Sequence, residues 1–168
     1  MIAPGYCVTM ARYNAWQNRQ LTDTLEALPV ADLTRDRGAF FGSILGTLNH
    51  LLWGDLIWMS RLDGGARPEG GIAESVQRLP TLGAREAERF RTDGRIRAWA
   101  EALRHVDLQG DLTWFSGASG REVTQPVALC AVHMFNHQTH HRGQVHAMLT
   151  AAELPAPVSD LVFMPKDR

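Results

Sequence analysis

The sequence predicts an all-α fold, an up-down four-helix bundle with a small β-hairpin before its last long helix, in a single domain over residues 1–168. Its composition, 45% apolar and 21% charged residues, is that of an ordinary globular domain. Apolar residues recur at spacings of three and four in long segments, which is the pattern of helices with one buried face. Glycine- and proline-rich stretches separate these segments, and helices of this length in one chain favour a bundle.

The first two helices are expected over Pro4 to Leu28 and over about Gly38 to Leu62. Pro29 and the polar stretch ADLTRDRG end the first helix, since proline cannot continue it. The second stops at DGG, where two consecutive glycines disfavour a helix. The expected start of this second helix is placed where the polar stretch ends.

A glycine- and proline-rich connector, GGARPEGG, leads to a short apolar piece over Ile72 to Leu79. The third long helix is expected from Leu82 to His105, although Gly94 in its middle costs about 1 kcal/mol relative to alanine. The next segments, DLTWFS and REVTQ, flank GASG, and such alternation around a glycine-rich turn predicts a β-hairpin.

The fourth helix is expected from Pro126 to about Ala152. Proline suits a first helical turn because its missing N–H is not needed there. Pro155 and Pro157 prevent any extension. The remaining tail, LPAPVSDLVFMPKDR, is expected to be extended and to pack across the end of the bundle.

Charge and hydropathy exclude several classes of function. The formal net charge of -1 argues against nucleic acid as a partner. No apolar stretch is long enough for a membrane span, and the first ten residues do not resemble a secretory signal. Two cysteines, Cys7 and Cys130, are too few for a disulfide scaffold or a thiolate zinc site. We therefore expect a cytoplasmic protein without a membrane partner.

Five of the seven histidines lie between His133 and His146 in the fourth expected helix. His137 and His141 are four residues apart, so their rings lie on consecutive turns and can reach one ion at roughly 2.0–2.1 Å. His133 and His140 border the same sector, about 40° and 60° from His137, whereas His146 lies on the opposite side. This sector is expected to face the core.

A third ligand must come from another helix, and His50 is the only histidine in the second one. Gly46 and Gly54 lie on its face and leave space beside the imidazole for a ligand or a substrate cavity. Spacing alone also permits structural or surface histidines, because an HxxxH pair occurs by chance. Several buried imidazoles need partners, however, and a shared metal ion would supply them.

Other polar residues are candidates for the pocket or for contacts to the ligands. Asn14, in the apolar stripe of the first helix, could orient a ligand or be a hydrogen-bonded core residue. Gln144 lies one turn beyond His141, close enough to hydrogen-bond it. His133 and His140 could line the pocket, pack elsewhere or be solvated.

The second helix has an apolar face opposite His50. A helix that is apolar on both sides is either central in the bundle or buried in an interface, and we expect a homodimer. The residues on this face are Ile44, Leu48, Leu51, Leu52, Met59 and Leu62.

Three segments resemble the DinB/YfiT family of bacterial four-helix-bundle metalloproteins: MARYNAWQNRQL, GAFFGSILGTLNHLLWGD and HMFNHQTHHRGQVHAML. They occur in the family's order from about Met10 to Phe163. The resemblance implies that His50, His137 and His141 bind a divalent metal ion, typically zinc or nickel. It also implies a homodimer. Similar ligand sets accept iron or manganese.

Members of that family with known chemistry include thiol-dependent isomerases and transferases. The resemblance therefore implies an enzyme in which the metal activates a small thiol for attack on an electrophilic small-molecule substrate. Three histidines equally suit a hydrolase that activates water. The remaining alternative is a metal-binding, stress-associated protein without turnover, in which the ion stabilises the bundle.

Overall fold

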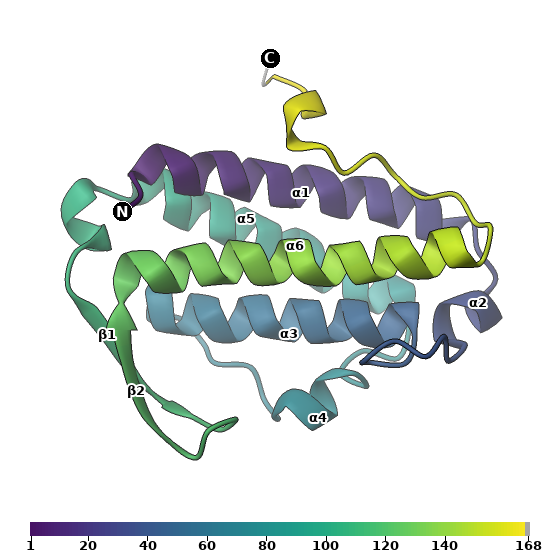
Figure 1. The fold of residues 1–168 in the computed structure, drawn as a ribbon, viewed down its shortest axis with the longest axis horizontal. Helices are drawn as coiled ribbons and strands as arrows, with labels where there is room; N and C mark the ends of the chain where they lie inside the picture. Colours follow the sequence, from purple (N-terminus) through teal and green to yellow (C-terminus); the bar gives the residue numbers. More distant parts are fainter. Residues whose placement is uncertain (167–168) are drawn as a thin grey trace.

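The computed structural model describes residues 1–166 and consists mainly of helices packed side by side along one long axis (Figure 1). The predicted four-helix bundle with a small hairpin is confirmed. The long helices are α1 (Pro4–Glu26), α3 (Ile44–Leu62), α5 (Leu82–Ala102) and α6 (Val127–Ala151).

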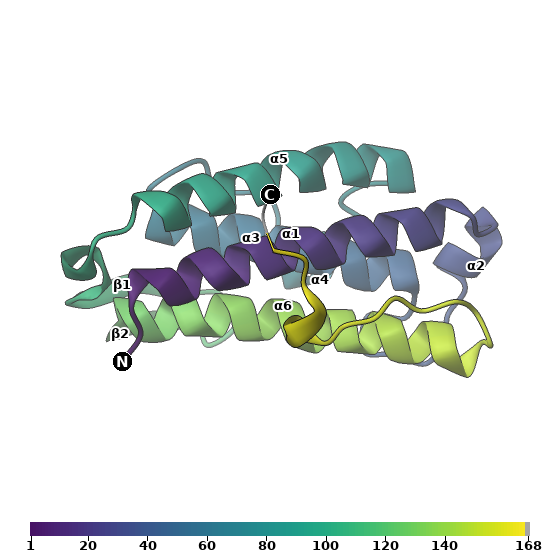
Figure 2. The same ribbon diagram turned by 90° about the horizontal axis from the view of Figure 1, so that it is seen from above.

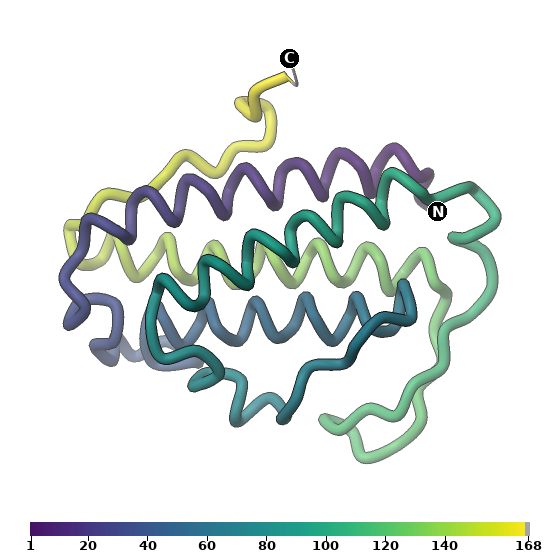
Figure 3. Tube along the Cα trace, turned by 180° about the vertical axis from the view of Figure 1, so that it is seen from behind, coloured from purple at the N-terminus to yellow at the C-terminus, as the bar shows by residue number. Residues whose placement is uncertain are grey.

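The helices do not alternate in direction along the chain, although the expected up-down order requires it. α1 and α6 run one way along the bundle, whereas α3 and α5 both run the other way (Figures 1 and 2). The connection between α3 and α5 allows this, because it returns along the length of the bundle and carries the short helix α4 (Ile72–Ser75) (Figure 3). The antiparallel neighbours α3 and α6 pack extensively on each other, and every histidine except His105 lies on these two helices.

The second long helix begins at Ile44, six residues later than expected. Gly38 and Gly42 have φ values of 70° and 71°, which are not helical, and Ala39 and Gly42 form an isolated β-bridge. The hydroxyl of Ser43 accepts a hydrogen bond from the backbone N–H of Gly46 and caps the helix. The polar stretch before these glycines holds a short helix, α2 (Val30–Thr34), that was not expected.

The third helix ends at Ala102 rather than at His105. Leu103 is extended, and His105 begins a separate 3₁₀ turn, η1 (His105–Leu108). Gly94 does not interrupt the helix.

The predicted hairpin is confirmed as β1 (Asp111–Ser116) and β2 (Arg121–Pro126) in antiparallel pairing. Trp114 pairs with Val123, so both half-buried side chains lie on one face of the ribbon. The hairpin extends away from the bundle beside α3 and α4 (Figure 1).

The C-terminal segment folds back beside α1 (Figure 2). The expectation that it crosses the end of the bundle is therefore wrong. The Tyr13 hydroxyl donates a hydrogen bond to the Ser159 carbonyl at 2.5 Å, and Gln17 donates to the Val158 carbonyl at 2.9 Å. Polar side chains on the outer face of α1 thus determine the path of the tail, which ends with a 3₁₀ turn, η2 (Leu161–Phe163).

The core consists of two apolar clusters with polar residues between them. One cluster, around Cys7, Met59 and Phe135, lies at the end near the start of α1, and the other, around Leu25 and Leu48, lies at the opposite end. The apolar face of α3 is central in the bundle, so it needs no partner chain to cover it. Its buried members are Ile44, Leu48, Leu51, Leu52 and Met59. Among residues 1–166, no helix is long and apolar enough to cross a membrane.

Candidate metal centre

Three histidines from α3 and α6 place their Nε2 atoms together. The Nε2 atom of His137 lies 3.3 Å from that of His50 and 3.0 Å from that of His141. One ligand atom from each of the three residues lies within 4.8 Å of the others. This grouping requires the close packing of α3 on α6, because His50 is far from the other two in the sequence. The three residues could therefore hold one metal ion.

The hydrogen bonds of Ser75 determine which ring nitrogen of His50 is free. The Ser75 hydroxyl donates to the Ile72 carbonyl at 2.6 Å, which uses its single proton. Its oxygen lies 3.0 Å from His50 Nδ1 and therefore accepts a hydrogen bond from that nitrogen. With the proton on Nδ1, the lone pair of His50 is on Nε2, directed toward the other two histidines.

Gln144 has the same effect on His141. Its side-chain oxygen lies 2.7 Å from His141 Nδ1 and accepts a hydrogen bond from it. The lone pair of His141 is therefore also on Nε2. The contact expected from the one-turn spacing between these residues is present, and it has the form in which a second residue orients a metal-binding histidine.

Gly54 allows His137 to lie against α3. A Cβ atom at position 54 would lie only 2.6 Å from His137 Cε1, so any side chain there would displace the ring. His137 Nδ1 is buried and has no hydrogen-bond partner among residues 1–166. The expected space beside Gly54 is thus occupied by one of the three imidazoles.

Burial keeps these imidazoles neutral. Desolvation, followed by the neighbouring charge of His141, lowers the pKa of His50 to about 4. Desolvation and the other histidines lower the pKa of His137 to about 3. The lone pairs of His50 and His141 point toward His137 Nε2, and a cation between the three Nε2 atoms would be bound by all three rings with the His137 proton on Nδ1. The donor set therefore fits a divalent ion such as zinc or nickel.

A cavity of about 460 Å³ borders the candidate centre, and His50 and His137 form part of its wall. Trp58 of α3 and Trp114 of the hairpin form another part. On a different side, the Phe41 ring stacks on His50 with the ring centres 3.9 Å apart. The histidines are thus covered by an aromatic ring on one side and face a cavity on another.

His133 and His140 lie at the edge of this arrangement. His133 lines the cavity and packs on Trp58, with ring centres 4.9 Å apart. His140 packs beside His141 at 4.9 Å but is solvent-exposed and does not line the cavity. The expectation that this sector faces the core is confirmed only in part: His141 is buried, but His133 and His140 are exposed. The buried stripe of α6 is centred about 100° from His137. It contains Met134, Phe135, Gln138, Arg142, Val145 and Leu149.

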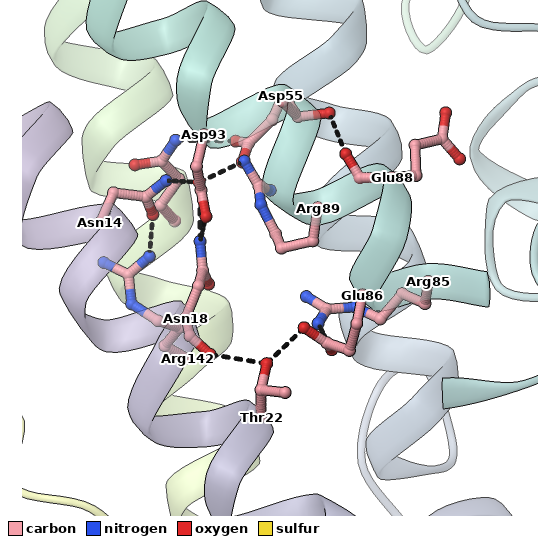
Figure 4. A network of polar contacts seen from close by, with 12 residues as sticks. Asn14, Asn18, Thr22, Asp55, Arg85, Glu86, Glu88, Arg89, Asp93 and Arg142 are labelled. Atoms are coloured by element: carbon pink, nitrogen blue, oxygen red, sulfur yellow. Dashed lines mark hydrogen bonds and ion pairs between the residues drawn. The ribbon is translucent and has the colours of Figure 1, made fainter. Parts of the chain in front are cut away.

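Asn14 belongs to a separate buried polar network (Figure 4). Its amide donates to Asp93 at 3.1 Å, and its carbonyl oxygen accepts from Arg142. It does not line the cavity. Of the two interpretations of this residue, the structure supports the hydrogen-bonded core residue.

Three residues near the histidines were not found from the sequence: Phe41, Arg61 and Ser75. Ser75 and Phe41 lie in short or irregular segments, where no periodicity links them to a helix face. Arg61 did carry a signal, because it follows His50 by eleven residues and so returns to within about 20° of the same face.

The fold and these side chains define a class: a four-helix bundle in which histidines of two helices could hold a metal ion. The chain belongs to the DinB family, whose model matches residues 1–166.

A curated relative, Protein DinB of Bacillus subtilis (strain 168), is 25% identical over 167 residues, covering 96% of each chain. Two solved structures share the fold. YfiT of Bacillus subtilis, described as a probable metal-dependent hydrolase with an unusual four-helix bundle topology, has a TM-score of 0.66 at 13% identity, over 92% of each chain. A DinB-like protein of Bacillus cereus ATCC 10987 has a TM-score of 0.59 at 18% identity, covering 87% of this chain and 90% of that one.

Proposed function

We propose that this protein is a divalent-metal-dependent enzyme whose small-molecule substrate binds in the cavity beside His50 and His137. The observation that carries the proposal is the convergence of three neutral histidine Nε2 atoms at the wall of that cavity. Catalytic zinc sites have three protein ligands and one position left for water or substrate, whereas structural sites are closed by four.

The ion would supply a positive centre that lowers the pKa of a nucleophile beside it. His50, His137 and His141 would hold it, with Ser75 and Gln144 fixing two of the rings by hydrogen bonds to Nδ1. Zinc and nickel are the first candidates, and iron and manganese are the alternatives.

The leading reaction is the transfer of a small thiol to an electrophilic substrate, as the resemblance to thiol-dependent members of the family implies. The cavity volume of about 460 Å³ lies within the usual range for small-molecule sites. Hydrolysis is the second candidate, because the structurally similar YfiT is described as a probable metal-dependent hydrolase. The cavity beside the histidines favours both reactions over a metal-binding protein without turnover.

A two-part activity screen tests the proposal. The zinc- or nickel-loaded protein would be assayed with 1-chloro-2,4-dinitrobenzene with and without added cysteine, and with 4-nitrophenyl acetate without thiol. We expect metal-dependent turnover that His137→Ala abolishes and that His105→Ala, which removes an exposed histidine of η1, leaves unchanged. A requirement for thiol would assign transfer, and turnover without it would assign hydrolysis. Turnover equal in wild type and His137→Ala would contradict the proposal.

The homodimer and the cytoplasmic location remain proposals. The face of α3 that first suggested an interface is inside the bundle, so a dimer would need another surface. The groove between α1 and α5 is a candidate dimer surface, because Phe90 in this groove is 80% exposed and Trp16 also lines it. Light scattering should give a dimer for wild type and a monomer for Phe90→Glu, whereas a monomeric wild type at micromolar concentration would contradict a homodimer.

A further inference from the structure

The cavity beside the histidines has a marked local charge. Its charged side chains are Arg61 and Arg67, and within residues 1–166 no aspartate or glutamate lines it. The chain as a whole has 18 acidic and 17 basic residues, so composition does not explain the absence. A cavity lined by one sign of charge attracts ligands of the other sign.

Arg61 packs against two indole rings that contact each other. Its guanidinium carbon lies 4.5 Å from the centre of the Trp58 ring and 5.0 Å from that of the Trp114 ring. The two indoles contact each other with ring centres 5.3 Å apart. Because Trp58 comes from α3 and Trp114 from β1, the guanidinium is positioned by two elements.

Two other partly buried arginines, Arg95 and Arg78, have carboxylate partners. Arg95 pairs with Asp63 at 2.6 Å, and Arg78 pairs with Glu88 at 2.7 Å. In the described part of the chain, no carboxylate lies within ion-pair distance of Arg61. Burial, and then the positive charge of Arg67, lower the pKa of Arg61. An anion from outside the chain would offset both effects.

The position of Arg61 along α3 indicates the shape of the ligand. Eleven residues separate it from His50, so the two Cα atoms lie on nearly the same face and about 16 Å apart along the axis. Ile57 and Trp58, between them in the sequence, also line the cavity. The cavity therefore has His50 and His137 at one end, apolar and indole walls with His133 in the middle, and the Arg61 guanidinium at the other end.

We propose that Arg61 binds the carboxylate of an elongated small-molecule substrate, with the planar or apolar body along Trp58 and Trp114 and the reacting group toward the histidines. The reaction of that substrate rests on the proposed function, whereas the carboxylate subsite itself does not require a metal ion. The flat guanidinium offers two parallel N–H donors, the geometry that matches a carboxylate. Arg67, in the exposed connector after α3, adds positive charge at the same end.

Paired ligands that differ only in charge test this subsite. Calorimetry on the full chain would compare 3-phenylpropionate with its uncharged isostere 3-phenylpropionamide. We expect wild type to prefer the carboxylate by roughly tenfold to hundredfold. Arg61→Met should remove the preference and Arg61→Lys should keep part of it, because lysine retains the charge but not the two-donor geometry. Arg97→Met, on the far side of the bundle, is the matched control and should behave as wild type.

Two further measurements separate this inference from the proposed function. Metal content of Arg61→Met should equal that of wild type, and His137→Ala should still prefer the carboxylate. The subsite is contradicted if wild type binds acid and amide equally, or if the preference persists in Arg61→Met and disappears in His137→Ala, since the carboxylate would then bind the metal. A wild-type protein without metal would overturn the proposed function while leaving the Arg61 comparison measurable.

Discussion

The molecule contains two groups of buried polar side chains that differ in where their partners come from. Around Asp55 and Arg89, opposite charges face each other: the guanidinium of Arg89 bonds the Asp55 carboxylate at 2.5 Å and lies 2.7 Å from Asp93 (Figure 4). Around His137, three imidazoles face one another with their Nε2 atoms close together. The first group has its partners within the chain itself, whereas the second leaves a place where a cation could bind.

The difference follows from how α6 contributes to both groups. Gln138 donates to Asp55 at 2.9 Å, and the adjacent residue, His137, faces the cavity instead. Neighbouring positions on a helix point about 100° apart, so one helix can serve a closed polar network and an open ligand site. Substitutions should therefore separate fold stability from metal affinity.

The largest expected effect is on the network. Asp55→Ala leaves the buried Arg89 without one of its two carboxylates and should lower the free energy of unfolding by about 3–5 kcal/mol. Asp63→Ala removes the ion pair between Asp63 and Arg95, which is more exposed than the pair between Asp55 and Arg89, and should cost less than about 1 kcal/mol. Urea denaturation checks both values. Equal losses in the two variants would mean that the buried network has no special role in stability.

The second effect should appear in metal affinity rather than in stability. Gln144→Leu removes the acceptor for His141 Nδ1 and should weaken metal binding by roughly tenfold to hundredfold. Gln138→Leu removes a contact of Asp55 instead, so it should lower stability and leave metal affinity unchanged. Competition titration with a chromophoric chelator, alongside urea denaturation, distinguishes the two. The comparison fails if both substitutions affect the same quantity.

A smaller effect is expected from one added methyl group. Gly54→Ala places a Cβ against His137 and should weaken metal binding by about tenfold, comparable with losing an orienting hydrogen bond. Gly94→Ala, whose added Cβ would meet no atom of residues 1–166 within 4 Å beyond the adjacent backbone of its own helix, should raise stability by about 1 kcal/mol and leave metal affinity unchanged. The same chelator titration measures both metal affinities, and urea denaturation measures the stability of Gly94→Ala. Unchanged affinity in Gly54→Ala would show that contact between His137 and α3 is not needed.

The smallest effect is on the pH dependence of the metal-free protein. The pKa values of His50 and His137, about 4 and about 3, lie below the ordinary value of 6.5, so the unfolded chain binds more protons as pH falls. Their contribution to stability is complete above pH 6.5 and is lost as pH falls toward these values. His137→Gln should lose less unfolding free energy between pH 7.5 and pH 5 than wild type does. An equal loss would contradict the account of neutral, desolvated imidazoles.

Periodicity predicted the long helices and the hairpin well, because the burial of one face determines both. It could not predict the parallel course of α3 and α5, since the long connector between them has no apolar pattern that specifies its path. The non-helical conformation of the glycines before Ile44 could not be predicted either, because a hydropathy pattern does not indicate the backbone conformation of a glycine.

The histidine spacing predicted which residues meet, but not what surrounds them. His137, His141 and Gln144 lie on one helix, where geometry follows from sequence separation. Asn14 was ambiguous because its partners, Asp93 and Arg142, come from two other helices. Ser75 was missed for the same reason: its contact with His50 depends on tertiary packing.

Metal content measured by plasma mass spectrometry tests the central claim most directly. Untagged wild-type protein would be loaded with zinc or nickel, desalted and compared with His50→Ala, His137→Ala and the control His105→Ala. The account predicts close to one ion per chain in wild type and in the control. It predicts loss of the metal in both site variants, which replace histidines of two different helices. Wild-type protein without metal after loading, or metal retained unchanged in both site variants, would contradict it.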